Sequence, residues 1–289
     1  MKENRVIKVK SDDKLLEFIL KNAEDLPRKK IKFMLTKKFI FVNGRAVSKF
    51  DFRLYKNDEV TLDLLGSLNL LGTYNIDLIY ENKDLIVINK PSGMLSIENN
   101  NSNLITAYRI MMTYTKLSNS QNRIFIVHRL DKDTSGVLIF AKNERIKFKL
   151  QENWNENVKI RGYYAVVEGK LKEKEGRIIS FLNEADKQYV FSTNDKSGKK
   201  AITDYRVISE NNNYSLVDVD IKTGRKNQIR VHLKELGHPI VKDKKYGSKD
   251  KGLKRLGLHA YKLSFIHPDT KKTLTFTTPV PKEFIKISK

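Results

Sequence analysis

Short apolar runs separated by polar turns dominate the chain from residue 76 onward. Two of them, residues 136–141 and 163–167, are mostly apolar and predict buried strands. Two others, residues 203–208 and 214–221, alternate apolar and polar side chains, which is typical of strands with one solvated face. Stretches of helical spacing lie between the strands. We therefore expect an α+β fold with a larger mixed, mainly antiparallel sheet and flanking helices.

Residues 12–65 follow a different pattern and predict a small α/β module. Apolar side chains at helical spacing indicate a first helix, and a second, very basic helix is expected at residues 28–38. Asn43-Gly44 is the strongest hairpin signal available, because a tight hairpin turn needs positive φ at both central residues. We expect residues 66–75 to be a linker and residues 76–289 to form the larger domain.

The charge balance favours a polyanionic partner. The sequence contains 56 Lys and Arg against 34 Asp and Glu, a formal net charge of +22 at pH 7. Small soluble domains carry net charges of roughly 2–8, so nucleic acid is the first expected partner and an anionic membrane surface the second. The alternative is that the composition is rich in lysine on every surface, in which case the charge does not indicate a particular partner.

The sequence contains no cysteine. Disulfides, iron–sulfur clusters, zinc ribbons and thiol nucleophiles are therefore excluded. No apolar run approaches the ~18 residues of a transmembrane helix, and the N-terminus lacks the apolar stretch of a signal peptide. We expect a cytoplasmic protein without membrane contacts. Since no two histidines show His-x-x-x-His spacing, no metal site is expected.

The densest polar cluster is residues 128–136, which lie between two apolar runs. Its carboxylates, cations and hydroxyls are costly to bury without partners, which favours a functional loop. An ordinary polar turn is the simpler interpretation. Residues 133–136, Asp-Thr-Ser-Gly, also match the signature of aspartic proteases. Those enzymes need two such loops whose carboxylates share a proton, and the sequence has one.

A second cluster, residues 223–232, is expected at the start of a helix over residues 225–236, with Thr223 as its cap. Arg225 and Lys226 would oppose the helix macrodipole at that end. This cost suggests an outside carboxylate or phosphate, and a solvated basic face is the alternative. A third candidate is the pair Tyr163 and Tyr164 on a strand, for which ordinary core and surface roles are the simpler interpretation.

Together these clusters resemble one family motif by motif and in the same order, the RluA-type pseudouridine synthases. The resemblance covers residues 76–289 and rests on segments 84–94, 128–142, 161–169, 198–205, 223–247 and 258–281. Residues 12–65 resemble the S-four RNA-binding domain that often precedes this catalytic domain. That second resemblance rests on the basic helix and on Phe41-Val42-Asn43-Gly44-Arg45.

The resemblance implies a monomeric RNA pseudouridine synthase that needs no cofactor. Large-subunit ribosomal RNA is the expected substrate and transfer RNA the alternative. Asp131 would act on the ribose, Arg230 would keep it charged in a dry pocket, and Tyr163 would flank the uracil. The implied substrate-binding residues are Arg129, Thr223, Arg225 and Gln228, and the implied RNA-binding residues are Arg28, Lys29, Lys32 and Arg45.

The chain departs from the family pattern outside the three catalytic positions. Residues 95–98 stand where a His-Pro pair is common, Arg161 where Lys is common, and Asn227 where His is common. These departures bear on substrate detail more than on activity. A non-catalytic basic relative that only binds RNA is the remaining alternative, although binding alone needs none of the catalytic trio.

Overall fold

The computed structural model describes residues 5–64, 66–98, 105–152, 154–185, 189–193, 196–249 and 252–289, apart from the side chains of residues 66–69 and 155. Leu65, the expected end of the N-terminal module, lies outside the described residues. The chain divides into two compact units. The N-terminal unit comprises residues 1–75 and 109–124, and the large unit comprises residues 76–108 and 125–289.

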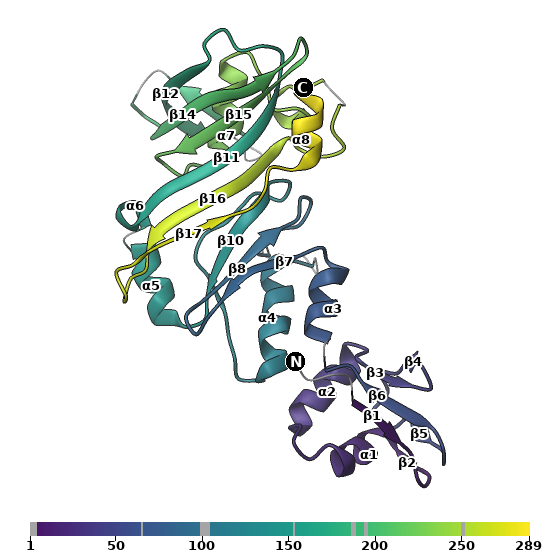
Figure 1. Ribbon diagram of the computed structural model, residues 1–289. Helices are drawn as coiled ribbons and strands as arrows, with labels where there is room; N and C mark the ends of the chain where they lie inside the picture. The colour runs from purple at the N-terminus through teal and green to yellow at the C-terminus, as the bar shows by residue number, and fades with distance from the viewer. Residues whose placement is uncertain are drawn as a thin grey trace. The chain divides into compact units, whose positions relative to one another are not determined.

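The N-terminal unit contains helices and a small sheet (Figure 1). Its elements are β1 (Arg5–Lys8), β2 (Asp13–Lys14), α1 (Leu15–Asn22), α2 (Arg28–Thr36), β3 (Ile40–Val42), β4 (Arg45–Ala46), β5 (Arg53–Leu54), β6 (Glu59–Leu62), α3 (Gly66–Thr73) and most of α4 (Ala107–Ser118). The sheet has the order β1-β6-β3-β4, and β2 pairs with β5. Apolar side chains of α1 and α2 share one buried core with those of β3 and β6.

The predicted hairpin of this unit is confirmed. Strands β3 and β4 are antiparallel, and Asn43 and Gly44 between them have φ of 50° and 76°. The basic helix ends at Thr36, earlier than expected, because Lys38 takes a φ of 59° that an α-helix cannot contain. Where we expected a linker, residues 66–73 form α3.

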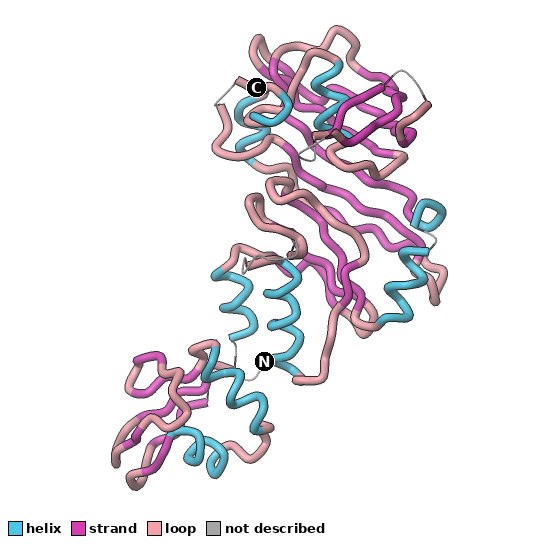
Figure 2. The backbone as a smooth tube through the Cα atoms, turned by 180° about the vertical axis from the view of Figure 1, so that it is seen from behind, coloured by secondary structure: helices cyan, strands magenta, loops and turns pink. Residues whose placement is uncertain are grey.

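The large unit is built on one sheet that is mixed and mainly antiparallel, as predicted (Figures 1 and 2). Its strands are β7 (Asp77–Glu81), β8 (Leu85–Lys90), β9 (Phe125–Ile126), β10 (Ser135–Ala141), β11 (Val158–Glu168), β12 (Glu175–Glu184), β13 (Val190–Thr193), β14 (Lys199–Glu210), β15 (Tyr214–Ile221), β16 (Leu258–Ile266) and β17 (Thr273–Thr277). In the described residues their order is β13-β12-β14-β15-β11-β16-β10-β8-β7, with β17 beside β16 and β9 beside β10. The pairing of β10 with β16 is parallel, and the other described pairings are antiparallel.

Helices cover both faces of this sheet. They are α5 (Glu144–Glu152), α6 (Trp154–Asn157), α7 (Gln228–Glu235), the short 3₁₀ helix η2 (Lys244–Tyr246) and α8 (Lys282–Ile287). Ala165 and Val167 of β11 share a core with α7, whereas Val166 between them shares a core with Phe284 of α8. Because successive strand side chains point to opposite faces, α7 and α8 lie on opposite sides. None of the described helices in either unit is long and apolar enough to cross a membrane.

Strand β10 lies inside the sheet, and every one of its residues is buried. Gly136 in this strand has φ of 121°, and an added Cβ would lie 2.1 Å from the carbonyl oxygen of Ala260. Glycine is therefore the residue that fits this close approach to β16. The loop before β10, residues 127–134, is anchored at this point of the sheet, and it contains most of the polar cluster that the sequence singles out.

Candidate active site

The loop of residues 127–134 is fastened to the segment of residues 90–96. Ser96 is buried, and its Oγ donates to the carbonyl oxygen of Leu130 at 2.7 Å and accepts from the Leu130 N–H at 3.0 Å. This reciprocal pair fixes the backbone one residue before Asp131. The role of Ser96 had no signal in the sequence beyond its departure from the family pattern.

Lys90 is completely buried beside the same loop. Its Nζ donates to the carbonyl oxygens of Pro91, Met94 and Lys132 at 2.9, 2.7 and 3.1 Å. Burial lowers the pKa of Lys90 from 10.5 to about 7, against the opposite effect of two aspartates of the loop. Lys90 thus ties the loop to the chain segment that follows β8, and its charge state is sensitive to pH.

The structure brings Asp131 and Arg230 together. Nη1 of Arg230 lies 3.7 Å from Oδ2 of Asp131, which is ion-pair distance but longer than a hydrogen bond. The Asp131 side chain is 43% exposed and that of Arg230 is 15% exposed. The expectation of a dry pocket around Asp131 is therefore wrong for the protein alone, because Asp131 stands with Lys132 and Asp133 on the exposed side of the loop.

Asp243 holds Arg230 more closely than Asp131 does. Arg230 donates from Nε and Nη2 to the two carboxylate oxygens of Asp243 at 2.7 and 2.8 Å, and from Nη1 to Oδ1 of Asn227 at 2.9 Å. The ring centroid of Tyr246 lies 4.9 Å from the guanidinium carbon. Although burial opposes the charge, the hydrogen bonds to Asp243 raise the pKa of Arg230. The sequence predictions assigned Asp243 no role, and its one signal was its place in the arginine motif.

Tyr163 lies half-buried on β11. Burial is the main cause that raises the pKa of its phenol to about 12, while Arg161 lowers that pKa and Asp131 raises it. The phenol is therefore neutral near pH 7 and can donate a hydrogen bond. The three predicted catalytic residues thus come from three different elements, the 127–134 loop, β11 and α7.

Gln228 is buried and uses all of its hydrogen-bonding positions inside the protein. Its Nε2 donates to Ile202 O and Thr203 Oγ1, both at 2.9 Å. Its Oε1 accepts from Thr223 Oγ1 at 2.8 Å and from Arg225 N at 3.0 Å. The Thr223 hydroxyl also accepts from Ile202 N at 2.9 Å. The polar groups of both side chains thus fasten α7 and the turn before it to β14, and their predicted substrate-binding role stays a prediction.

The predicted helix start is also corrected. Helix α7 begins at Gln228, and its N-cap, Asn227, has a left-handed backbone with φ of 55°. Arg225 therefore precedes the helix, where its Nε donates to Lys200 O at 3.0 Å. The terminal nitrogens of Arg225 and the whole guanidinium of Arg129 have no partner in the described part of the chain, and both side chains are exposed. These two arginines are free to meet an anion.

The four predicted RNA-binding residues are all exposed in the N-terminal unit. Arg28, Lys29 and Lys32 lie on α2, and Arg45 lies on β4. Arg28 and Lys32 line a groove of about 430 Å³ together with Phe50, whose side chain is 62% exposed. Lys29 and Arg45 do not line this groove. The unit therefore offers cations beside an exposed aromatic ring.

Comparison with known proteins agrees with this geometry. The family described as RNA pseudouridylate synthase matches residues 84–235. YhcT of Bacillus subtilis, named an uncharacterized RNA pseudouridine synthase, is 31% identical over 281 residues, which cover 96% of this chain and 93% of YhcT. The ribosomal large subunit pseudouridine synthase D of Borreliella burgdorferi is 35% identical over 278 residues, with 91% of this chain and 85% of that protein covered. A solved structure, human RNA Pseudouridylate Synthase Domain Containing 4, supports the fold, with a TM-score of 0.62 at 23% identity over 76% of this chain and 94% of that chain.

Proposed function

The chain belongs to the RNA pseudouridylate synthase family, and we propose that Asp131 is its catalytic carboxylate and large-subunit ribosomal RNA its substrate. The protein is an RNA pseudouridine synthase, an isomerase that converts a uridine into pseudouridine. The observation that carries the proposal for the site is the ion pair of Asp131 with Arg230, at 3.7 Å, beside a neutral Tyr163 phenol.

The reaction exchanges one bond for another within a single nucleotide. The bond from N1 of the uracil to C1′ of the ribose breaks, and C5 of the same ring bonds to C1′. C5 loses its proton and N1 gains one, so the atoms balance and no oxidant or cofactor is required. Asp131 supplies the carboxylate that acts on the ribose. Its exposed position suits a nucleotide that has left its stack, at a cost of roughly a few kcal/mol.

Arg230 places a positive charge beside Asp131 and fixes its orientation. The two hydrogen bonds to Asp243 hold the guanidinium so that Nη1 faces Asp131. A bound nucleotide covers the exposed carboxylate and excludes water from it. The attraction between Asp131 and Arg230 then becomes stronger, because charges interact more strongly where water is excluded.

Tyr163 provides the surface against which the detached uracil turns. Its ring flanks the base, and its neutral phenol can take part in moving the C5 proton. The catalytic residues all belong to one chain, which supports a monomer as the active form. The cysteine-free composition is compatible with a cytoplasmic location, which we propose.

RNA recognition is shared between the two units in this proposal. Arg129, next to the catalytic carboxylate, enters the space that the target base leaves or binds a phosphate, and Arg225 binds a neighbouring phosphate. Residues 12–65 act as an S-four-like module in which Arg28, Lys29, Lys32 and Arg45 meet phosphates. The net charge of +22 supports both contacts. Ribosomal RNA is favoured because the Borreliella burgdorferi relative is named for the ribosomal large subunit.

The test is to map pseudouridines in total RNA from cells with and without the gene, complemented with the wild-type protein or with Asp131→Asn. We expect loss of pseudouridine at one or a few large-subunit positions, restored by the wild type alone. A loss confined to transfer RNA would reject the ribosomal substrate. An unchanged pattern in every RNA would identify a binding protein without catalysis.

A further inference from the structure

Arg161 is a buried cation with few partners. It lies two residues before Tyr163 on β11 and is 9% exposed. Its Nη2 donates to the carbonyl oxygen of Lys222 at 2.5 Å. The other N–H groups of the guanidinium have no acceptor among the described residues, and no described carboxylate lies at ion-pair distance. Because buried donors without acceptors are costly, this arrangement points to an acceptor that the protein does not supply.

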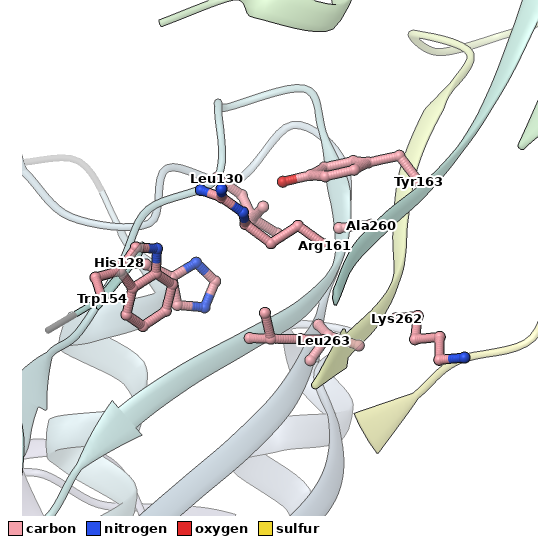
Figure 3. A pocket seen from close by; sticks show the side chains of 9 residues that line it. His128, Leu130, Trp154, Arg161, Tyr163, Ala260, Lys262 and Leu263 are labelled. Carbon is pink, nitrogen blue, oxygen red and sulfur yellow. The ribbon is translucent and has the colours of Figure 1, made fainter. Parts of the chain in front are cut away.

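The Arg161 guanidinium lines a small cavity next to the candidate active site (Figure 3). The cavity has a volume of about 20 Å³, which is room for about one water-sized group. Tyr163 and Leu130, the neighbour of Asp131, also line it. Figure 3 shows the hydroxyl of Tyr163 and the guanidinium of Arg161 on the same side of this space. The cavity therefore adjoins the loop that carries Asp131 and the side chain of Tyr163.

The polar groups around this cavity favour a hydrogen-bond acceptor. Arg161 can only donate, and the neutral Tyr163 phenol can donate. His128 also lines the cavity, and burial together with Arg161 lowers its pKa to about 4, so its ring is neutral. The Nε2 of His128 accepts from Ile139 N at 3.3 Å, so its Nδ1 carries the proton. Donors around a space for one atom fit a carbonyl oxygen, whereas a phosphate group is too large.

We propose that Arg161 donates a hydrogen bond to a carbonyl oxygen of the target uracil and thereby positions the ring beside Asp131. This proposal rests on the pseudouridine synthase reaction described above. Uracil carries two carbonyl oxygens, O2 and O4. Holding one of them fixes how the detached ring faces C1′ and supports the turn that brings C5 forward. Arg161 is therefore a substrate-binding residue of the same site.

The turn before α7 shapes the position of this guanidinium. The carbonyl oxygen of Lys222 accepts a hydrogen bond from Nη2 of Arg161. Gly224 leaves room for the guanidinium, because an added Cβ there would lie 2.8 Å from Nη1 of Arg161. Arginine can bond Lys222 with one nitrogen and the uracil oxygen with another. The three donors of a lysine all start from one nitrogen, so they cannot reproduce the two separate nitrogen positions of the guanidinium. Arginine at this position, where lysine is common in the family, thus leaves one guanidinium nitrogen for the uracil oxygen while another bonds Lys222.

The test is a double-mutant cycle between Arg161 and the uracil oxygens. A stem–loop RNA that contains the mapped target is synthesised with uridine, 2-thiouridine or 4-thiouridine at that one position, because sulfur is a poorer hydrogen-bond acceptor than oxygen. Single-turnover conversion is measured for the wild type, Arg161→Met, Arg161→Lys and Lys262→Met. Lys262 is the matched control, since it lines the same cavity but its amine is directed away from it in Figure 3.

For the wild type, sulfur at the bonded position should slow conversion about tenfold, as expected for one charge-assisted hydrogen bond. Arg161→Met should convert the uridine RNA about tenfold more slowly, with RNA affinity nearly unchanged, and should lose that sulfur effect. Arg161→Lys should show a reduced sulfur effect, which keeps the test valid if Arg161→Met does not fold. Lys262→Met should keep the wild-type sulfur effect.

The proposal would be overturned if 2-thiouridine slowed the wild type and the Arg161 variants by the same factor, and 4-thiouridine did so as well. Arg161 would then be a structural residue. An active wild-type enzyme with that result rejects this proposal alone. A wild type that converts no uridine in the mapped RNA rejects the proposed function and this proposal with it.

Discussion

Nη1 of Arg230 lies 3.7 Å from Oδ2 of Asp131, while the opposite edge of the same guanidinium is bound by Asp243. The two carboxylates differ in burial, because the side chain of Asp243 is 1% exposed and that of Asp131 is 43% exposed. Arg230 is thus a fixed cation whose orientation is set by Asp243 and Asn227 and whose Nη1 faces Asp131. Such preorganisation lets the cation act on Asp131 without rearrangement during the reaction.

Asp243→Asn should therefore impair both the fold and the chemistry. Arg230 would lose its buried carboxylate, and breaking a buried pair of this kind costs roughly 3 kcal/mol in the free energy of unfolding. We also expect a single-turnover rate that falls at least about tenfold, because the guanidinium is no longer held toward Asp131. Denaturant unfolding and single-turnover assays measure the two effects.

Asp204→Asn is the matched control for this prediction. Asp204 accepts from Nε and Nη2 of Arg177 in the same bidentate geometry, but that arginine side chain is 59% exposed. Exposed pairs contribute roughly 0–1 kcal/mol, so the destabilisation should be small. Equal destabilisation of the two variants would contradict the special role of Asp243.

Lys90 should make the stability of the protein increase with pH. Its pKa is about 7 in the folded protein and near 10.5 in the unfolded chain. Between these values the unfolded chain binds more protons, so the free energy of unfolding rises with pH across this window. Below about pH 7 the lysine is charged in both states, and its contribution no longer changes.

The comparison that checks this effect is urea unfolding of the wild type and of Lys90→Met between pH 6 and 10, at intervals of about one unit of pH. Lys90→Met lacks the titrating group, so the wild type should gain stability relative to it above about pH 7. A constant difference across the range would mean that the three carbonyl acceptors keep the ammonium charged in the folded protein.

Much of the fold could be predicted from local pattern. The alternating strands and the Asn43-Gly44 hairpin follow from side-chain periodicity and from the φ values that two residues can adopt. The predicted start of α7 was wrong, because Asn227 takes a left-handed backbone and Gln228 makes long-range hydrogen bonds to β14. Such hydrogen bonds depend on tertiary structure, which helix propensity does not contain.

In the candidate site too, sequence motifs predicted some residues, and tertiary structure alone revealed the others. Asp131, Tyr163 and Arg230 could be named from motifs, since each stands in a recognisable segment. Asp243 and Ser96 could not be given roles, because their hydrogen bonds join segments far apart in the sequence, to Arg230 and to Leu130. The exposure of Asp131 was equally hidden, since a motif does not report the solvent around a side chain.

The basic helix α2 should contribute RNA affinity without chemistry. Replacing Arg28, Lys29 and Lys32 together by Gln should weaken binding and reduce the slope of log K against log salt by roughly 0.7–0.9 for each phosphate that is no longer neutralised. The single-turnover rate at saturating RNA should be unchanged. Because residues 109–124 cluster with the N-terminal unit, substitutions in the full chain test this more cleanly than deletion does.

Filter binding at several salt concentrations measures the affinity and slope of this triple variant, and thermal unfolding checks its fold. All three side chains are exposed, so the melting temperature should match the wild type. An unaltered salt slope, or the absence of the chemical step at saturation, would refute this division of labour.

The most direct measurement is single-turnover pseudouridine formation by Asp131→Asn on the mapped RNA, with Asp133→Asn as the control. The amide is nearly isosteric with the carboxylate but cannot act as a nucleophile or base, so Asp131→Asn should fold, bind RNA as the wild type does and form no pseudouridine. Asp133 is a neighbouring exposed carboxylate and belongs to the protease-like Asp-Thr-Ser-Gly segment. Its variant should stay active. More than a few per cent of the wild-type rate in Asp131→Asn, or loss of activity in Asp133→Asn alone, would contradict the assignment of Asp131.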